Sequence, residues 1–161
     1  MKKPQNITEN TAITSSWLIH LFHQNGIHNL QNFSWQKELI KDNSRNHIYT
    51  YKIQYTQDQG NLTPTRCKKN LIVKDYQPQF EHARKLQPGI IKEVQFYEQI
   101  SKQFPQGTIP KCHYAYYTTR PFNALIIVQN LKESGYYQLE QISSISINEW
   151  KSLLKTLAKI H

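Results

Sequence analysis

The chain has 161 residues, and its 20 Lys and Arg against 11 Asp and Glu give a formal net charge of +9. This length suits one domain, or one lobe of a larger protein. No apolar run approaches the roughly 20 residues of a membrane-spanning helix, and polar residues rather than an apolar segment follow Met1. We therefore expect a cytoplasmic protein that has no signal peptide and does not enter a membrane.

The positive charge raises the possibility of a nucleic-acid partner, because Lys and Arg neutralise phosphates. The basic residues are dispersed, however, and no basic run is longer than the two lysines at 2–3 or at 68–69. A solvated basic surface explains this pattern better. Nucleic-acid binding remains an alternative function.

The first half of the chain predicts a helix followed by three strands. Residues 13–24 place several large apolar side chains on one helical face, and Asn25-Gly26 ends that helix. Alternating and then continuous apolar patterns predict the strands. These lie at 33–40, 48–55 and 71–73.

The second half predicts a helix, two strands and a final helix. The helix covers Ile90–Gln103, with Pro88-Gly89 at its start. Strands follow at 112–118 and 124–128, a polar loop at 132–144, and an amphipathic helix at 147–161. This order of elements predicts an α+β fold.

A lysine that ends an apolar strand is the feature with the clearest chemical meaning. Lys74 follows Leu71-Ile72-Val73, and Glu93 lies about twenty residues later in the predicted helix. A buried ammonium group needs an anionic partner, which a helical carboxylate or a nucleotide phosphate supplies. The alternative is a strand-end lysine that extends to water.

The order of these elements resembles the N-terminal lobe of the aminoglycoside phosphotransferase and choline kinase superfamily, in particular its ecdysteroid kinase-like branch. The resemblance runs collinearly along the chain. Its pieces are Thr14-Ser15-Ser16-Trp17-Leu18, Leu71-Ile72-Val73-Lys74, Lys92-Glu93-Val94-Gln95-Phe96-Tyr97, Ile109-Pro110-Lys111-Cys112-His113-Tyr114-Ala115, Leu125-Ile126-Ile127-Val128-Gln129-Asn130-Leu131 and Leu157-Ala158-Lys159-Ile160-His161.

This resemblance implies a protein-kinase-like N-lobe. The expected fold is an antiparallel five-stranded sheet with a helix inserted after the third strand, flanked by N- and C-terminal helices. The whole chain, 1–161, would be one lobe, with a leading helix in 1–30, the sheet and inserted helix in 33–131, and the truncated start of the second lobe in 145–161. In the family, the second lobe carries a His-x-Asp catalytic loop, its Asn and a metal-binding Asp, none of which occurs here.

The resemblance also implies an ATP-dependent phosphotransferase that acts, with Mg²⁺, on a hydroxyl group of a small molecule. Lys74 would hold the α- and β-phosphates, and Glu93 would position Lys74. The remaining expected nucleotide contacts are the main chain of the hinge and the apolar cover of the base. They comprise Gln129, Asn130, Leu131, Ile40, Ile72 and Ile127.

Two positions depart from the family pattern. The connector at 41–46 has no glycine, although a phosphate-covering loop benefits from one. Gln129-Asn130 replace an acidic pair that is usual at the hinge. We expect this chain alone to be inactive, and the alternative is a non-catalytic kinase-like module that binds a protein partner, or the missing lobe, through the 147–161 helix.

Metal and thiol chemistry have little support in the sequence. The seven histidines are scattered without acidic or cysteine ligands at a closed spacing. Cys67 and Cys112 lie outside any C-x-x-C motif, and Cys112 and His113 are neighbours that a strand directs to opposite faces. We therefore expect neither a metal centre nor a cysteine nucleophile.

Overall fold

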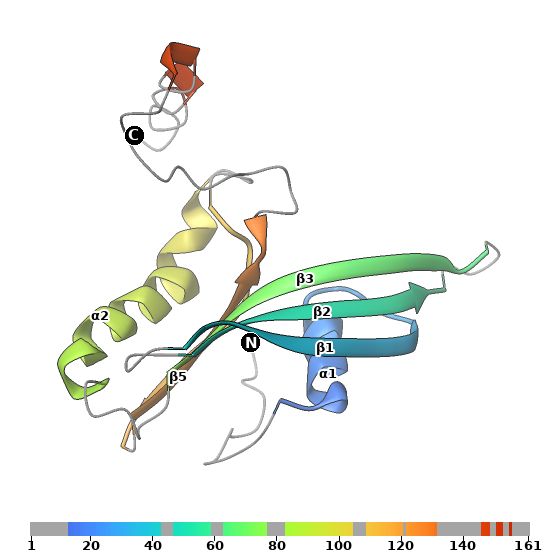
Figure 1. Cartoon of the computed structure of the whole chain (residues 1–161), viewed down its shortest axis with the longest axis horizontal. Coiled ribbons are helices and arrows are strands. Elements are labelled where there is room, and N and C mark those ends of the chain that lie inside the picture. The colour runs from blue at the N-terminus through green and yellow to red at the C-terminus, as the bar shows by residue number, and fades with distance from the viewer. Residues whose placement is uncertain are drawn as a thin grey trace. The chain divides into compact units, whose positions relative to one another are not determined.

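The computed structural model describes most of the chain between residues 13 and 155 (Figure 1). The described residues are 13–42, 47–58, 63–76, 83–104, 109–120, 122–131, 146–148, 151–152 and 155. The predicted loop at 132–144 lies outside them. Of the predicted 147–161 helix, five positions are described, and all five are helical and exposed.

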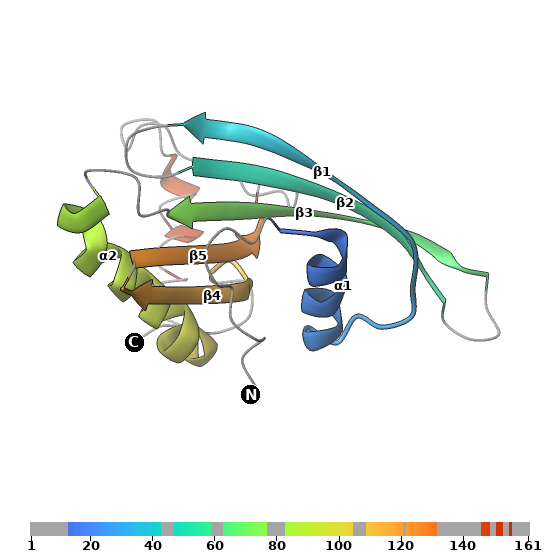
Figure 2. The same ribbon diagram turned by 90° about the horizontal axis from the view of Figure 1, so that it is seen from below.

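The fold is α+β, as the sequence predicts, with a five-stranded antiparallel sheet and a helix inserted after the third strand. Figure 2 shows the strands side by side in the order β1-β2-β3-β5-β4. The elements are α1 (Ser15–Gln24), β1 (Leu30–Asp42), β2 (His47–Gln57), β3 (Thr65–Tyr76), α2 (Ala83–Gln95), β4 (Cys112–Thr119) and β5 (Phe122–Gln129). A π-helical turn, Phe96–Ile100, and a 3-10 turn, Ser101–Gln103, follow α2.

The chain divides into two compact units that share the long strands. One unit comprises residues 1–35 and 53–68, and the other comprises 36–52 and 69–161. The division cuts β1, β2 and β3, because each of these strands is long enough to contribute to both units. Among the described residues, no helix is long and apolar enough to cross a membrane.

The first unit is built on α1. Thr14 caps this helix by accepting a hydrogen bond from the Trp17 amide at 3.2 Å. At the other end the chain leaves the helix through Gly26, whose φ of 81° is the left-handed conformation that glycine adopts at low cost. Phe22 is 1% exposed, and its ring packs on the rings of Phe33 and Tyr55. The predicted helix and its terminating Asn25-Gly26 are therefore confirmed.

The second unit is centred on β5, which pairs antiparallel with β3 on one side and with β4 on the other. The side chains from Phe122 to Val128 are buried on both faces of this strand, apart from the half-buried Asn123. Helix α2 packs on the face that carries Ala124, Ile126 and Val128. Helix α2 and the buried central strand β5 therefore form the core of this unit.

Helix α2 begins at Ala83, seven residues before the predicted start at Ile90. Pro88-Gly89 predicts a later start, because proline is favoured in the first turn of a helix. In the structure Pro88 lies at the sixth position, inside the helix. A proline there removes one main-chain hydrogen bond, and the buried residues Ile90 and Val94 hold the helix on the sheet beyond it.

Candidate functional site

The structure brings Lys74 and Glu93 together. Lys74 Nζ lies 2.5 Å from Glu93 Oε1, and the two side chains are 28% and 30% exposed. Lys74 opposes Ile126 in the β3–β5 ladder, so it projects from the face of the sheet that α2 covers. Glu93 faces it because the neighbouring Val94, which is fully buried, fixes the rotation of the helix. A strand and a helix separated by six undescribed residues thus supply one ion pair.

A third side chain completes this group. The Tyr76 hydroxyl donates a hydrogen bond to Glu93 Oε2 at 3.3 Å, so each carboxylate oxygen has its own donor. Tyr76 is 7% exposed and belongs to the core between α2 and β5. Tyr76 is not among the predicted site residues, although residues 74 and 76 of one strand face the same side.

The group as a whole is a partly buried cation, an anion and a neutral donor. The charge of Glu93 balances that of Lys74, which reduces the cost of burying either group. The same carboxylate also affects the pKa of Tyr97, which lies one helical turn later. Burial, and then the negative charge of Glu93, raise the pKa of the Tyr97 hydroxyl.

The predicted hinge residues are tied to the sheet through their main chain. The Gln129 amide donates to the Lys111 carbonyl at 2.9 Å, and the Asn130 amide donates to the Asn70 carbonyl at 3.2 Å. Gln129 opposes Leu71 in the β3–β5 ladder, three residues from Lys74. At about 3.3 Å per strand residue, the hinge and Lys74 are separated by about 10 Å along the sheet.

The three isoleucines expected to cover a base are not together on one surface. Ile72 shares the face of Lys74 and packs against the α2–β5 core. Ile127 opposes Val73 instead, so it lies on the opposite face of β5 and is fully buried. Ile40, near the end of β1, is 56% exposed. The structure therefore joins Ile72 with Lys74 and separates Ile127 from it.

A second ion pair in the same unit offers a comparison. Lys52 Nζ lies 2.5 Å from Glu38 Oε2, but these side chains are 50% and 58% exposed. Both residues come from strands, and their exposure allows water to screen the charges. The Lys74–Glu93 pair is the more buried of the two and the one that contacts the helix.

Cys112 and His113 of β4 are both partly buried. Cys112 packs against the α2–β5 core, and burial raises its pKa to about 12, so the thiol stays protonated at neutral pH. The β4–β5 ladder shifts register at His113. Burial, and then the charges of Lys111 and Lys69, lower the pKa of His113 to about 4. The described part of the chain holds no group of three or more His, Cys, Asp or Glu side chains suited to a metal ion.

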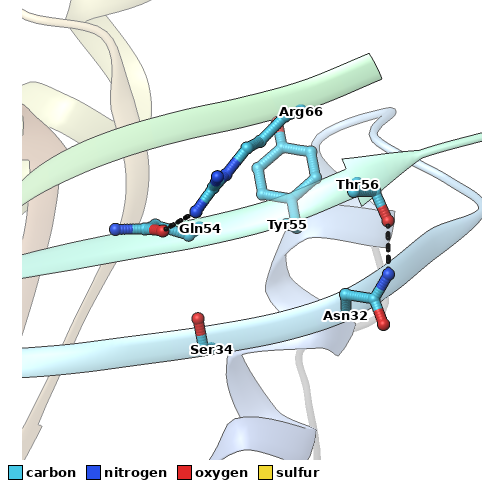
Figure 3. Close-up of a pocket in the computed structure, with 6 residues that line it drawn as sticks. All are labelled: Asn32, Ser34, Gln54, Tyr55, Thr56 and Arg66. Carbon is cyan, nitrogen blue, oxygen red and sulfur yellow. Dashed lines mark hydrogen bonds between the residues drawn. The ribbon is translucent and has the colours of Figure 1, made fainter. Parts of the chain in front are cut away.

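A surface pocket of about 290 Å³ lies in the other unit, on the strands β1, β2 and β3 (Figure 3). Arg66 donates to Gln54 at 3.1 Å and Asn32 donates to Thr56 at 3.2 Å along its wall. These cross-strand bonds already use the polar groups that face one another. The pocket contains neither Lys74 nor Glu93, so we do not assign the site to it.

Comparison with known protein families gives a match over most of the chain. A sequence model of the Ecdysteroid kinase-like family matches residues 41–161, a range that includes Lys74, Tyr76, Glu93 and the predicted hinge. No curated protein and no solved structure matches the chain.

Proposed function

Because the chain belongs to the ecdysteroid kinase-like family, we propose that it is the nucleotide-binding lobe of an ATP-dependent phosphotransferase that acts on a hydroxyl group of a small molecule. Family membership supports a kinase-like phosphotransferase fold. The observation that carries the more specific proposal is the Lys74–Glu93 ion pair between a sheet and its covering helix. Such a pair holds an ammonium group where phosphate oxygens can bind it.

Lys74 is proposed to bind the α- and β-phosphates, and Glu93 to keep Lys74 extended toward them. Support comes from the balance of charge in this pair. A bound phosphate shares the ammonium with Glu93, and the partial burial of both side chains strengthens each interaction relative to bulk water. Lys52, in the exposed pair with Glu38, lacks this burial.

The adenine is proposed to bind at the hinge, Gln129–Leu131, with Ile72 beneath the base. The separation of about 10 Å between Gln129 and Lys74 along the sheet suits a ribose between a base and its first phosphates. The Gln129 and Asn130 amides already donate within the lobe. The Leu131 amide is therefore the donor that we assign to the base.

Mg²⁺ would accompany the nucleotide and neutralise charge on its phosphates. The described residues supply no cluster of carboxylates or imidazoles for it, so no catalytic step of this chain is assigned to a metal. We propose that the 161-residue chain binds nucleotide without turnover, since the sequence has no His-x-Asp catalytic loop.

The test compares two lysine variants for binding of MgATP by titration calorimetry. Lys74→Met should weaken binding at least tenfold, whereas Lys52→Met, which breaks an ion pair of the same length, should leave affinity within twofold. Equal losses in both variants, or no binding by the wild-type chain, would contradict the assignment of the phosphate site. The proposed inactivity would be overturned if the purified chain phosphorylated hydroxylated compounds and the Lys74→Met variant did not.

A further inference from the structure

The side chain of Glu93 is held by two donors from one strand, and they differ in kind. Lys74 contributes a charged ammonium at the end of a flexible stem, and Tyr76 contributes a hydroxyl on a ring that is 7% exposed. The ring is fixed by the core around it, which includes Ile90, Val94 and Ala124. The tyrosine hydroxyl is therefore the fixed point of the group.

A glutamate loses the freedom of three rotatable bonds when it is held in one geometry. One bond to Lys74 leaves the carboxylate free to turn about that contact, whereas a second bond at Oε2 fixes its plane. Lys74 and Tyr76 are two residues apart on β3, so the same strand that directs the ammonium toward α2 also directs the hydroxyl there. Each of the two donors contacts a different oxygen of the same carboxylate.

We propose that Tyr76 is a positioning residue that holds Glu93 in the orientation in which it pairs with Lys74. The consequence of this role rests on the proposed function: the Lys74 ammonium stays directed at the phosphates when a nucleotide competes with Glu93 for it. The contact between Tyr76 and Glu93 is independent of that function.

The role can be measured through the reactivity of Lys74. An amine that is ion-paired and partly buried reacts slowly with an acylating reagent, because only the free neutral amine attacks the acyl carbon. We would acetylate the full chain with an N-hydroxysuccinimide ester and follow each lysine by mass spectrometry. Lys52 is the internal control. Its ion pair with Glu38 has the same 2.5 Å separation and includes neither Tyr76 nor Glu93.

Tyr76→Phe keeps the buried ring and removes only the hydroxyl. It should raise the acetylation rate of Lys74 about threefold or more and leave that of Lys52 unchanged. Tyr117→Phe is the matched control, because it removes a hydroxyl from a tyrosine packed on the same core. It should change neither rate, and its unfolding midpoint measures what the loss of a hydroxyl there does to stability.

The decisive comparison uses Glu93→Ala. Lys74 should react fast in this variant, and adding Tyr76→Phe should produce no further increase, because Tyr76 then has no carboxylate to hold. An unchanged Lys74 rate in Tyr76→Phe would overturn the proposal, as would an equal increase in the Glu93→Ala background. A parallel series with MgATP separates the two claims. Failure of the nucleotide to protect Lys74 in the wild-type chain counts against the proposed function, while the ATP-free rates judge Tyr76.

Discussion

We predict that His113 makes the stability of this protein depend on pH. It lies at the register shift of β4, where burial, and then the charges of Lys111 and Lys69, lower its pKa from the usual 6.5 to about 4. The substitution His113→Gln removes the titrating group and retains a polar side chain of similar size. The variant isolates what this one imidazole contributes.

The direction in which pH changes the free energy of unfolding depends on which state binds the proton more readily. In the unfolded chain His113 is protonated as the pH falls through 6.5, whereas the folded protein resists protonation until about pH 4. Between these values the unfolded state binds more protons, so the free energy of unfolding falls as the pH falls. A pKa difference of this size corresponds to about 3 kcal/mol without screening. Since His113 is only partly buried, we expect a loss of about 2 kcal/mol between pH 7 and pH 4.

The assay is urea unfolding of wild type and His113→Gln at pH 7, 5.5 and 4. Carboxylates that titrate in the same range affect both proteins, so the difference between their slopes reports His113. His20→Gln, which changes an exposed histidine on α1, serves as the matched substitution outside β4. The same loss of stability with falling pH in wild type and His113→Gln would refute the reasoning.

Two further predictions concern the supports of the fold, and each has a matched control. Val94→Ala should lower the free energy of unfolding by about 2 kcal/mol, because the Val94 side chain of α2 is fully buried against β5. Ile100→Ala, at a residue that is 45% exposed, should lower it by less than about 1 kcal/mol. Equal losses of the two variants in urea unfolding would contradict this account of the packing. Gly26→Ala should destabilise the folded protein by about 1 kcal/mol, because φ is 81° at this position, although the added methyl group meets no atom. Gly89→Ala should stabilise the protein by about 0.5–1 kcal/mol, because this glycine lies inside α2 with open space around it. Changes of the same sign in thermal unfolding would show that backbone conformation does not distinguish these glycines.

The sequence alone predicted the order of the helices and strands from α1 to β5 and the pairing of Lys74 with Glu93. Lys74 was identified because a charge at the end of an apolar strand requires a partner, and Glu93 because its helix follows that strand. Both inferences depend on local pattern, which hydrophobic periodicity makes visible. The five strands, α1 and its termination at Gly26 were predictable for the same reason.

Only the tertiary structure decided which side chains share a face. The sequence of β5 is apolar at successive positions, so it does not show that Ile126 faces Lys74 and Ile127 faces away. Nor does it show that α2 extends back to Ala83 through Pro88, whose missing amide removes only one main-chain hydrogen bond. Tyr76 was overlooked because its pattern is that of any core tyrosine. Its contact with Glu93 depends on the placement of a helix that begins seven residues further along the chain, and local sequence does not encode that placement.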